Sequence, residues 1–293
     1  MDTPDDVTTR VEETLGALWY LARHPLRRPR LRSLLRARTL DEADRGDGDV
    51  PLTEETLLAP GSSRFLNVYS REGILRGMRA HGLLDRLAAL GFTRVDVALD
   101  LADPFHQRVT VFDGDPAREL GEVVASRRRV EALGGVTLER PGDVIDIAWL
   151  AIEDPDDRSG GALPGQERAG LHLLRPVIDM TLAGAAHLGF AAVLATPAHY
   201  HLAWMYHPWY RPLDPRDEGA LLALRRAAGA RSRRDTSWLV AQGRVRKDGA
   251  PWAWGHPTMC APIDPRLRAG LTSLDYARRA TEAAAEARFE VGV

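Results

Sequence analysis

The stretch from Asp143 to Asp214 constrains the fold of this chain most, because its hydrophobic pattern changes along its length. Residues 144–152 form a nearly continuous apolar run, which is typical of a buried strand. A Gly-containing turn follows, and apolar residues then recur at helical spacing from Leu173 to Leu182. A second apolar run, 191–195, leads into an aromatic-rich segment from Pro197 to His207. We therefore expect a strand, a turn, a helix, a second strand and a second helix, in that order.

The turn from Leu163 to His172 is the first candidate for a ligand site. Backbone N–H groups at a helix start lack intrahelical partners, and the helix dipole adds partial positive charge there. Such a position favours an anionic ligand. A diphosphate-bearing cofactor is therefore the first hypothesis to test.

The residues before this stretch predict an antiparallel meander. Residues 95–101 and 107–112 alternate between apolar and polar, and Asp103-Pro104 between them is a hairpin signal. A weaker strand is expected at 120–130, and the strand at 144–152 joins the sheet as its next member. Strands in a meander combined with strand–helix–strand predict an α+β fold, with a mixed, mostly antiparallel sheet flanked by helices.

Three segments are expected along the chain. Residues 1–62 are predicted to form an N-terminal helical arm and linker, 63–214 the core, and 215–293 a C-terminal helical extension with a loop rich in Trp, Pro and Gly. The core should open with a short strand at 64–69, followed by a helix that Ser70 caps and Gly91 ends. Further helices are expected at 7–40, broken near Pro25 and Pro29, and at 217–228, 237–242 and 273–289, and a loop is expected at 247–265.

The order of elements between residues 93 and 214 resembles the Gcn5-related N-acetyltransferase (GNAT) family. In that family a turn reading Arg/Gln-x-x-Gly-x-Gly/Ala binds the pyrophosphate of coenzyme A. Here Glu167 takes the first slot, with Gln166 beside it, while Gly170 takes the first Gly slot and His172 the second. The family's next block reads roughly Asn-x-x-Ala-x-x-x-Tyr, and it falls on Tyr200, Ala203 and His207.

The resemblance implies a GNAT-like fold and an acyl-coenzyme A-dependent N-acyltransferase. Acetyl-CoA or another acyl-CoA would be the co-substrate, and a small-molecule or peptide amine would be the acceptor. Backbone groups of the 144–152 strand would contact the thioester arm, and the turn would contact the pyrophosphate. The cofactor-binding residues implied in this way are Leu150, Ala151, Ile152, Gln166, Glu167, Arg168, Ala169, Gly170, Leu171, His172 and Tyr200.

Acyl transfer to an amine needs a base for the ammonium and benefits from an acid for the departing thiolate. By resemblance, a carboxylate at the end of the 144–152 strand would be the base, and Glu153 is preferred over Asp154 because it continues the strand. Tyr206 and His207 compete for the role of acid. For the carboxylates the alternative is a solvated strand end. For Tyr206 and His207 it is packing within an aromatic helix face.

Two other functions remain open. The first is a non-catalytic GNAT-like protein that binds a metabolite or partner, because His172 stands where the family has Gly. The second is a histidine-ligated metalloenzyme, because His199, His201 and His207 are close in sequence, with His172 and His187 nearby. On a helix, His199 and His201 would point in different directions unless the segment is extended. No metal ligands are therefore predicted.

Several aromatic and sulfur residues have a structural or a functional interpretation. Trp149 is expected in the core because it lies in the middle of a predicted strand. Trp252 and Trp254 lie in the predicted 247–265 loop and are candidates for a lid. Cys260 is the only cysteine, which excludes an intramolecular disulfide and a cysteine-based zinc site, and a buried thiol is expected.

Composition narrows the possible partners. The chain has 293 residues, of which 44% are hydrophobic and 27% charged, as in ordinary globular proteins. Its formal net charge of −2 gives no general attraction to nucleic acid or anionic membrane. The Arg-rich stretch 23–38 is followed by acidic residues and is expected to be a solvated face, with a basic binding arm as the alternative. No apolar run could span a bilayer, and the acidic N-terminus lacks the features of a secretion signal, so a cytoplasmic location is expected.

Overall fold

The computed structural model describes residues 4–28, 63–157 and 161–292, with side chains from residue 14 onward in the first helix. Its main sheet has seven strands in the order β1-β2-β3-β4-β5-β9-β6. Neighbouring strands are antiparallel except β4 and β5, which are parallel. The predicted α+β class with a mostly antiparallel sheet is therefore confirmed. The strands are β1 Val95–Asp100, β2 Gln107–Asp113, β3 Asp115–Leu133, β4 Val136–Ile152, β5 Ala192–Ala195, β6 Arg211–Pro212 and β9 Met259–Pro262.

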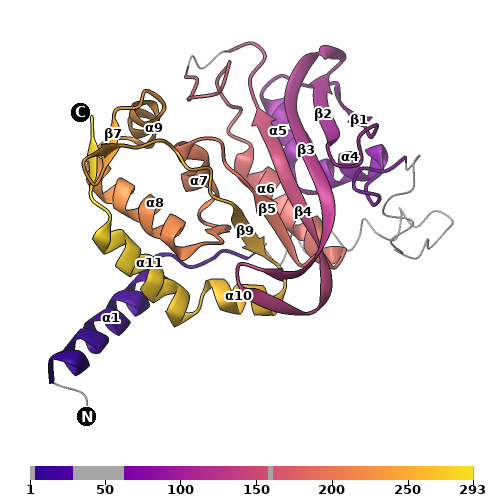
Figure 1. Cartoon of the computed structure of the whole chain (residues 1–293). Helices are drawn as coiled ribbons and strands as arrows, with labels where there is room; N and C mark the ends of the chain where they lie inside the picture. The colour runs from indigo at the N-terminus through magenta and orange to yellow at the C-terminus, as the bar shows by residue number, and fades with distance from the viewer. Residues whose placement is uncertain (1–3, 29–62, 158–160, 293) are drawn as a thin grey trace.

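Helices flank this sheet, and a second, three-stranded sheet lies near the C-terminus (Figure 1). The small sheet has the order β10-β7-β8, with β7 at Val245–Lys247, β8 at Ala250–Pro251 and β10 at Phe289–Val291. The helices are α1 Pro4–Arg23, α4 Arg71–Ala80, α5 Leu83–Ala89, α6 Leu174–His187, α7 Tyr200–Tyr206, α8 Pro215–Ala228, α9 Arg233–Ala241, α10 Pro265–Leu271 and α11 Leu274–Glu286.

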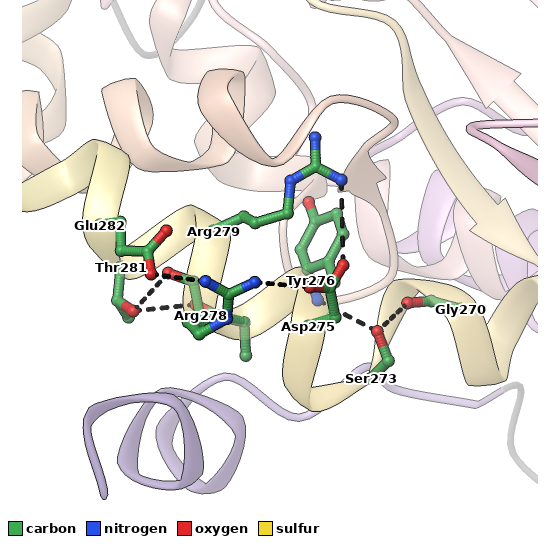
Figure 2. Close-up of polar contacts among 9 residues, drawn as sticks. Gly270, Ser273, Asp275, Tyr276, Arg278, Arg279, Thr281 and Glu282 are labelled. Carbon is green, nitrogen blue, oxygen red and sulfur yellow. Dashed lines mark hydrogen bonds and ion pairs between the residues drawn. The ribbon is translucent and has the colours of Figure 1, made fainter. Parts of the chain in front are cut away.

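Side-chain caps explain where several helices begin. The predicted Ser70 cap is confirmed, because its hydroxyl accepts a hydrogen bond from the Gly73 N–H. At α11, the Ser273 hydroxyl accepts from the Tyr276 N–H and donates to the Gly270 carbonyl (Figure 2). Figure 2 also shows Arg278 of α11 between Asp275 and Glu282, at the i,i+3 and i,i+4 spacings that place side chains on one helix face.

The ribbon of β3 and β4 is much longer than the sequence predicts. The two strands meet at Gly134-Gly135, where both residues have positive φ values of 56° and 77°. A two-residue hairpin loop of this kind requires positive φ, which glycine adopts without steric cost. The Gly-Gly pair is therefore a hairpin signal that the sequence interpretation missed. Because of it, β3 and β4 extend well beyond 120–130 and 144–152.

Other sequence expectations were wrong in detail. Residues 64–69 form a tight turn closed by a single bridge between Phe65 and Tyr69 rather than a strand. The helix expected from Ser70 to Gly91 breaks into α4 and α5 around Gly82, which has φ of 70°. The predicted loop at 247–265 contains β8, β9 and part of β7. The C-terminal segment is therefore more than a helical extension, because β9 lies inside the main sheet between β5 and β6.

The core occupies both faces of the sheet. Along β5, Val193 and Ala195 belong to one buried cluster, while Ala192 and Leu194 belong to the other. A strand buried on both faces explains why this run is continuously apolar rather than alternating. Cys260 on β9 is fully buried, and burial raises its thiol pKa to about 12, as expected for an inert thiol. Trp149, in contrast, is 47% exposed, so its predicted place in the core was wrong.

The N-terminal helix packs on the C-terminal one. Ala17 and Tyr20 of α1 form a buried cluster with Ala277 of α11, and α1 lies beside α11 in Figure 1. The predicted linker at 41–62, and the Arg-rich stretch beyond Arg28, lie outside the described residues. Within the described part of the chain, no helix has the length and apolarity to cross a membrane.

Candidate functional site

The two parallel strands of the main sheet, β4 and β5, are paired along only part of β4. The strands pair from Val144 with Ala192 to Ile147 with Ala195, where β5 ends. β4 continues to Ile152, and over this last part it pairs only with β3 among the described strands. On the β5 side, Leu150 and Ala151 therefore have no strand partner among the described residues, whereas Gly170 covers the end of the strand at Ile152 and Glu153. These three strand residues, Leu150, Ala151 and Ile152, are the ones predicted to contact a cofactor. Backbone N–H and C=O groups need partners, so an open edge is suited to binding an extended ligand.

The loop after β4 returns to the end of that strand before it enters α6. Gly170 forms an isolated antiparallel bridge with Glu153, and the Asp154 N–H donates to the Ala169 carbonyl at 2.7 Å. Gln166 holds the preceding turn, because its N–H donates to the Leu163 carbonyl and its side-chain Oε1 accepts from the Leu163 N–H. The predicted turn residues are therefore brought to the C-terminal end of β4, with Ala169 and Leu171 buried and Glu167 and Arg168 exposed.

The N-terminus of α6 lacks both a side-chain cap and nearby negative charge in its first turn. Leu173 precedes the helix without a side-chain cap, and the first turn contains no acidic residue. Arg175 lies in this first turn; its side chain is 53% exposed, and its Nε lies 4.0 Å from Asp179 Oδ2 one turn later. Free N–H groups, the helix dipole and a nearby guanidinium all favour negative charge here.

His172 occupies the second Gly slot in a glycine-like conformation. Its φ is 57°, in the left-handed region that glycine favours, and the residue is exposed. The backbone of the slot therefore matches what a glycine would adopt, although a histidine stands there.

Glu153, the predicted base, lies just after the end of β4 and is partly buried. Burial raises the pKa of its carboxyl, and the nearby Glu167 carboxylate adds to the rise. Burial also raises the pKa of Glu119, with Glu122 and Glu153 contributing to that rise. Asp154 has a structural contact instead, because it is buried and its Oδ1 accepts from the Asp156 N–H.

The two candidate acids, Tyr206 and His207, lie at the C-terminal end of α7. Tyr206 is buried, and burial raises its pKa to about 12. His207 is buried with its Nε2 at 2.7 Å from Glu218 Oε1, and the Tyr20 hydroxyl donates to the same oxygen. Arg211 donates to the carbonyls of His207 and His24. Among the described residues, no hydrogen bond, ion pair or ring contact joins Tyr206 or His207 to Glu153 or to the turn.

The near end of α7 carries His199 and Tyr200. A Cβ atom added at Gly165 would overlap His199 Nε2 and would lie 2.7 Å from its Cδ2, so the imidazole rests against this turn. Tyr200, a predicted cofactor contact, is buried with its ring edge-on to Trp254. The Trp254 indole N–H donates to the Pro197 carbonyl, and Trp252 packs against Trp254 and Phe289. Both tryptophans are half-buried and hold the corner after β5.

His199 was interpreted from the sequence only as a possible metal ligand and not as part of a coenzyme site. His199 is the N-cap of α7, with extended backbone angles, and its ring stacks on that of His201 at 5.6 Å. Because His199 has an extended backbone rather than a helical one, its ring and that of His201 can lie side by side. Even so, the residues that the structure describes contain no group of three or more His, Cys, Asp or Glu placed to hold a metal ion.

No protein-family model matches this chain, and no curated protein matches it significantly. The fold and the site define an α+β protein in which two parallel strands part beside an uncapped helix N-terminus. Any more specific function must be inferred from that geometry.

Proposed function

We propose that this chain is an acyl-coenzyme A-dependent N-acyltransferase with a GNAT-like fold. The observation that carries the proposal is the separation of β4 and β5 after Ile147 and Ala195, next to the N-terminus of α6. An open strand edge can hydrogen-bond the amide-containing arm of coenzyme A, and a free helix N-terminus can bind its pyrophosphate. The two features lie at the same end of the parallel strands, as one extended ligand requires.

The residues of the turn support this assignment. Gly170 pairs with Glu153, and a Cβ there would lie 3.3 Å from the Ile152 carbonyl oxygen, so the backbone approaches the strand end closely. His172, in the second Gly slot, has φ of 57°, a left-handed conformation that glycine adopts without steric cost. The backbone at this slot therefore suits a glycine, although the sequence has histidine there.

Glu153 supplies the chemistry in this proposal. Its raised pKa makes it a stronger base than an ordinary carboxylate. It would take the proton of the acceptor ammonium, the amine nitrogen would attack the thioester carbonyl carbon, and the carbon–sulfur bond would break. The departing sulfur takes up a proton, so the products are an amide and a free thiol. The acceptor is an amine of either small-molecule or peptide origin.

A second candidate function is non-catalytic binding of the same ligand. It is favoured by the positions of Tyr206 and His207, which are buried and show no contact with Glu153 among the described residues. Such a protein would bind coenzyme A but would transfer no acyl group to any amine.

Thermal unfolding with and without ligand tests the proposal. A ligand present at a hundredfold excess over its dissociation constant should stabilise the protein by about 2.7 kcal/mol. We expect acetyl-CoA and coenzyme A to raise the melting temperature, and adenosine alone to have a smaller effect. Melting curves that millimolar coenzyme A and several acyl derivatives leave unchanged would refute both candidate functions. Binding without turnover across a panel of amines would favour the second.

A further inference from the structure

His199 joins the two corners that follow the parallel strands. It lies in the short connection between β5 and α7, and its ring rests against Gly165 in the loop between β4 and α6. Its ring nitrogens make no hydrogen bond with any residue that the structure describes, and the residue is only partly buried. Because Nε2 lies on the side of the ring that faces Gly165, Nδ1 is the nitrogen left for a ligand.

The ring of His201 stacks on the ring of His199. His201 is 2% exposed, and its Nδ1 lies 2.8 Å from the Ser237 hydroxyl. The two imidazoles are nearly parallel, with 9° between their planes. His201 Nε2 is buried and has no hydrogen-bond partner among the described residues, so this corner retains unused polar capacity.

The charge state of this pair favours hydrogen bonding over ionic attraction. Burial lowers the pKa of His199, and the nearby His256 lowers it further. Burial also lowers the pKa of His201 to about 4. Both rings are therefore neutral near pH 7, where a neutral imidazole can donate one hydrogen bond and accept one. An uncharged amide or carbonyl group is the chemical match.

We propose that His199 contacts bound acyl-coenzyme A through a ring nitrogen, with His201 and Ser237 as the residues that position it. This inference rests on the proposed function, and it assigns the contact to the amide-containing arm or the thioester rather than to the phosphates. It also explains why Gly165 has no side chain, because any Cβ there would displace the ring from the corner.

Calorimetric titration with coenzyme A and with acetyl-CoA tests the contact. Loss of one hydrogen bond of ordinary strength should weaken binding about three- to tenfold. We expect this loss for His199→Ala and a smaller one for His199→Gln, which keeps a polar side chain. His106→Ala is the matched control, because His106 is an exposed histidine bonded only to Asp103 among the described residues. It should bind like the unmodified protein.

Nitrogen NMR of the histidine rings provides a readout that does not depend on activity. Coenzyme A should shift the ring signals of His199 in the unmodified protein. Ser237→Ala should alter the signals of His201 and His199 without ligand, and Ser237→Thr should restore them. If coenzyme A binds but neither moves the His199 signals nor binds more weakly to His199→Ala, the contact is refuted and the proposed function stands. If the unmodified protein binds no coenzyme A, both are refuted.

Discussion

The Nε2 atom of His207 lies 2.7 Å from Oε1 of Glu218, in the interior of the protein. Glu218 is fully buried, and Tyr20 of α1 donates to the same carboxylate oxygen. Arg211 lies beside this group, bonded to the backbone carbonyls of His207 and His24. The four side chains join α1, the end of α7, β6 and α8. Their burial and mutual contacts suit a structural role.

Removing Glu218 should destabilise the protein severely. Glu218→Ala leaves His207 and the Tyr20 hydroxyl buried without their hydrogen-bond partner and removes the negative charge beside Arg211. Breaking a buried pair typically costs about 3–5 kcal/mol. Urea denaturation measures the loss. The control is Glu282→Ala on the exposed face of α11, where the pair with Arg278 should contribute less than about 1 kcal/mol (Figure 2). Equal losses for the two variants would contradict a structural role for the buried carboxylate.

The stability of the protein should fall in acid in two stages. Burial and the neighbouring His207 lower the pKa of His24 from 6.5 to about 4, so the unfolded chain binds more protons between these values. Stability is then lost as the pH falls from 6.5 toward 4. Contacts with His207, Arg211 and Tyr20 outweigh the effect of burial and lower the pKa of Glu218 from 4.5 to about 2, which adds a loss between these two values.

Free energies of unfolding measured from pH 7 to pH 4 test the first stage. His24→Gln should flatten the dependence, because the group that titrates is removed. His201 contributes in the same direction, so some slope should remain. The exposed His106→Gln serves as control. A profile that His24→Gln leaves as steep as before would show that other groups cause the acid sensitivity.

Gly165→Ala should disturb the site through His199. The substitution adds a side chain at φ of 80° and makes it overlap the imidazole. Gly189→Ala measures the cost of the positive φ alone, because Gly189 has φ of 76° and nothing lies within 4 Å of its added Cβ. That cost should be about 1 kcal/mol, and Gly165→Ala should exceed it. In the double variant Gly165→Ala/His199→Ala, the loss of stability caused by Gly165→Ala should fall to that of Gly189→Ala. Denaturant unfolding measures these losses. If the loss stays larger in the double variant, the overlap with His199 is not its cause.

Glu153→Gln should lower acyl transfer by about 10² to 10⁴, with little change in the affinity for coenzyme A, because the base is lost while its shape remains. Higher pH should restore part of the rate by deprotonating the amine. Steady-state rates with an acceptor amine found by screening measure the effect, and Glu131→Gln is the control, because Glu131 is exposed near the hairpin end of β3. Unchanged turnover in Glu153→Gln would refute its role as base.

The two candidate acids need different experiments. Tyr206→Phe removes one hydroxyl and keeps the packing of the ring, so a comparable loss of rate without loss of stability would support Tyr206 as the acid. His207→Ala is ambiguous by itself, because it breaks the contact with Glu218. Its rate must be interpreted together with its free energy of unfolding. If Tyr206→Phe retains full activity, Tyr206 is not the acid.

His172→Gly should stabilise the protein and tighten its binding of coenzyme A. A residue other than glycine in the left-handed region costs about 1–2 kcal/mol, and the exposed His172 side chain offers little packing in return. Gly170→Val is the opposite change, because its Cβ would lie 3.3 Å from the Ile152 carbonyl and its methyl groups need more space. It should weaken binding. Weaker binding by His172→Gly would show that the imidazole itself holds the ligand.

Local pattern was sufficient to predict the elements from residue 144 to 206 and the cap of α4, although it gave no sign of the short strand β6. Hydrophobic period and capping depend on residues within a few positions of one another, so Ser70 and the two apolar runs could be interpreted directly. The end of β4 at Glu153 and the turn around Gly170 were predicted for the same reason. Their mutual bridge confirms that they lie together, although their chemical roles remain predictions.

Contacts between distant residues had no such signal. The insertion of β9 between β5 and β6, the pairing of His207 with Glu218 and Tyr20, and the packing of His199 on Gly165 all join segments that are apart in the chain. Trp149 shows the same limit, because its exposure depends on what covers that face of β4. Burial and pairing are properties of the packed chain, in which each residue's neighbours come from several elements. The sequence therefore determined the order of the elements. Packing of the whole chain determined which side chains lie near the unpaired part of β4 and which are buried in the core.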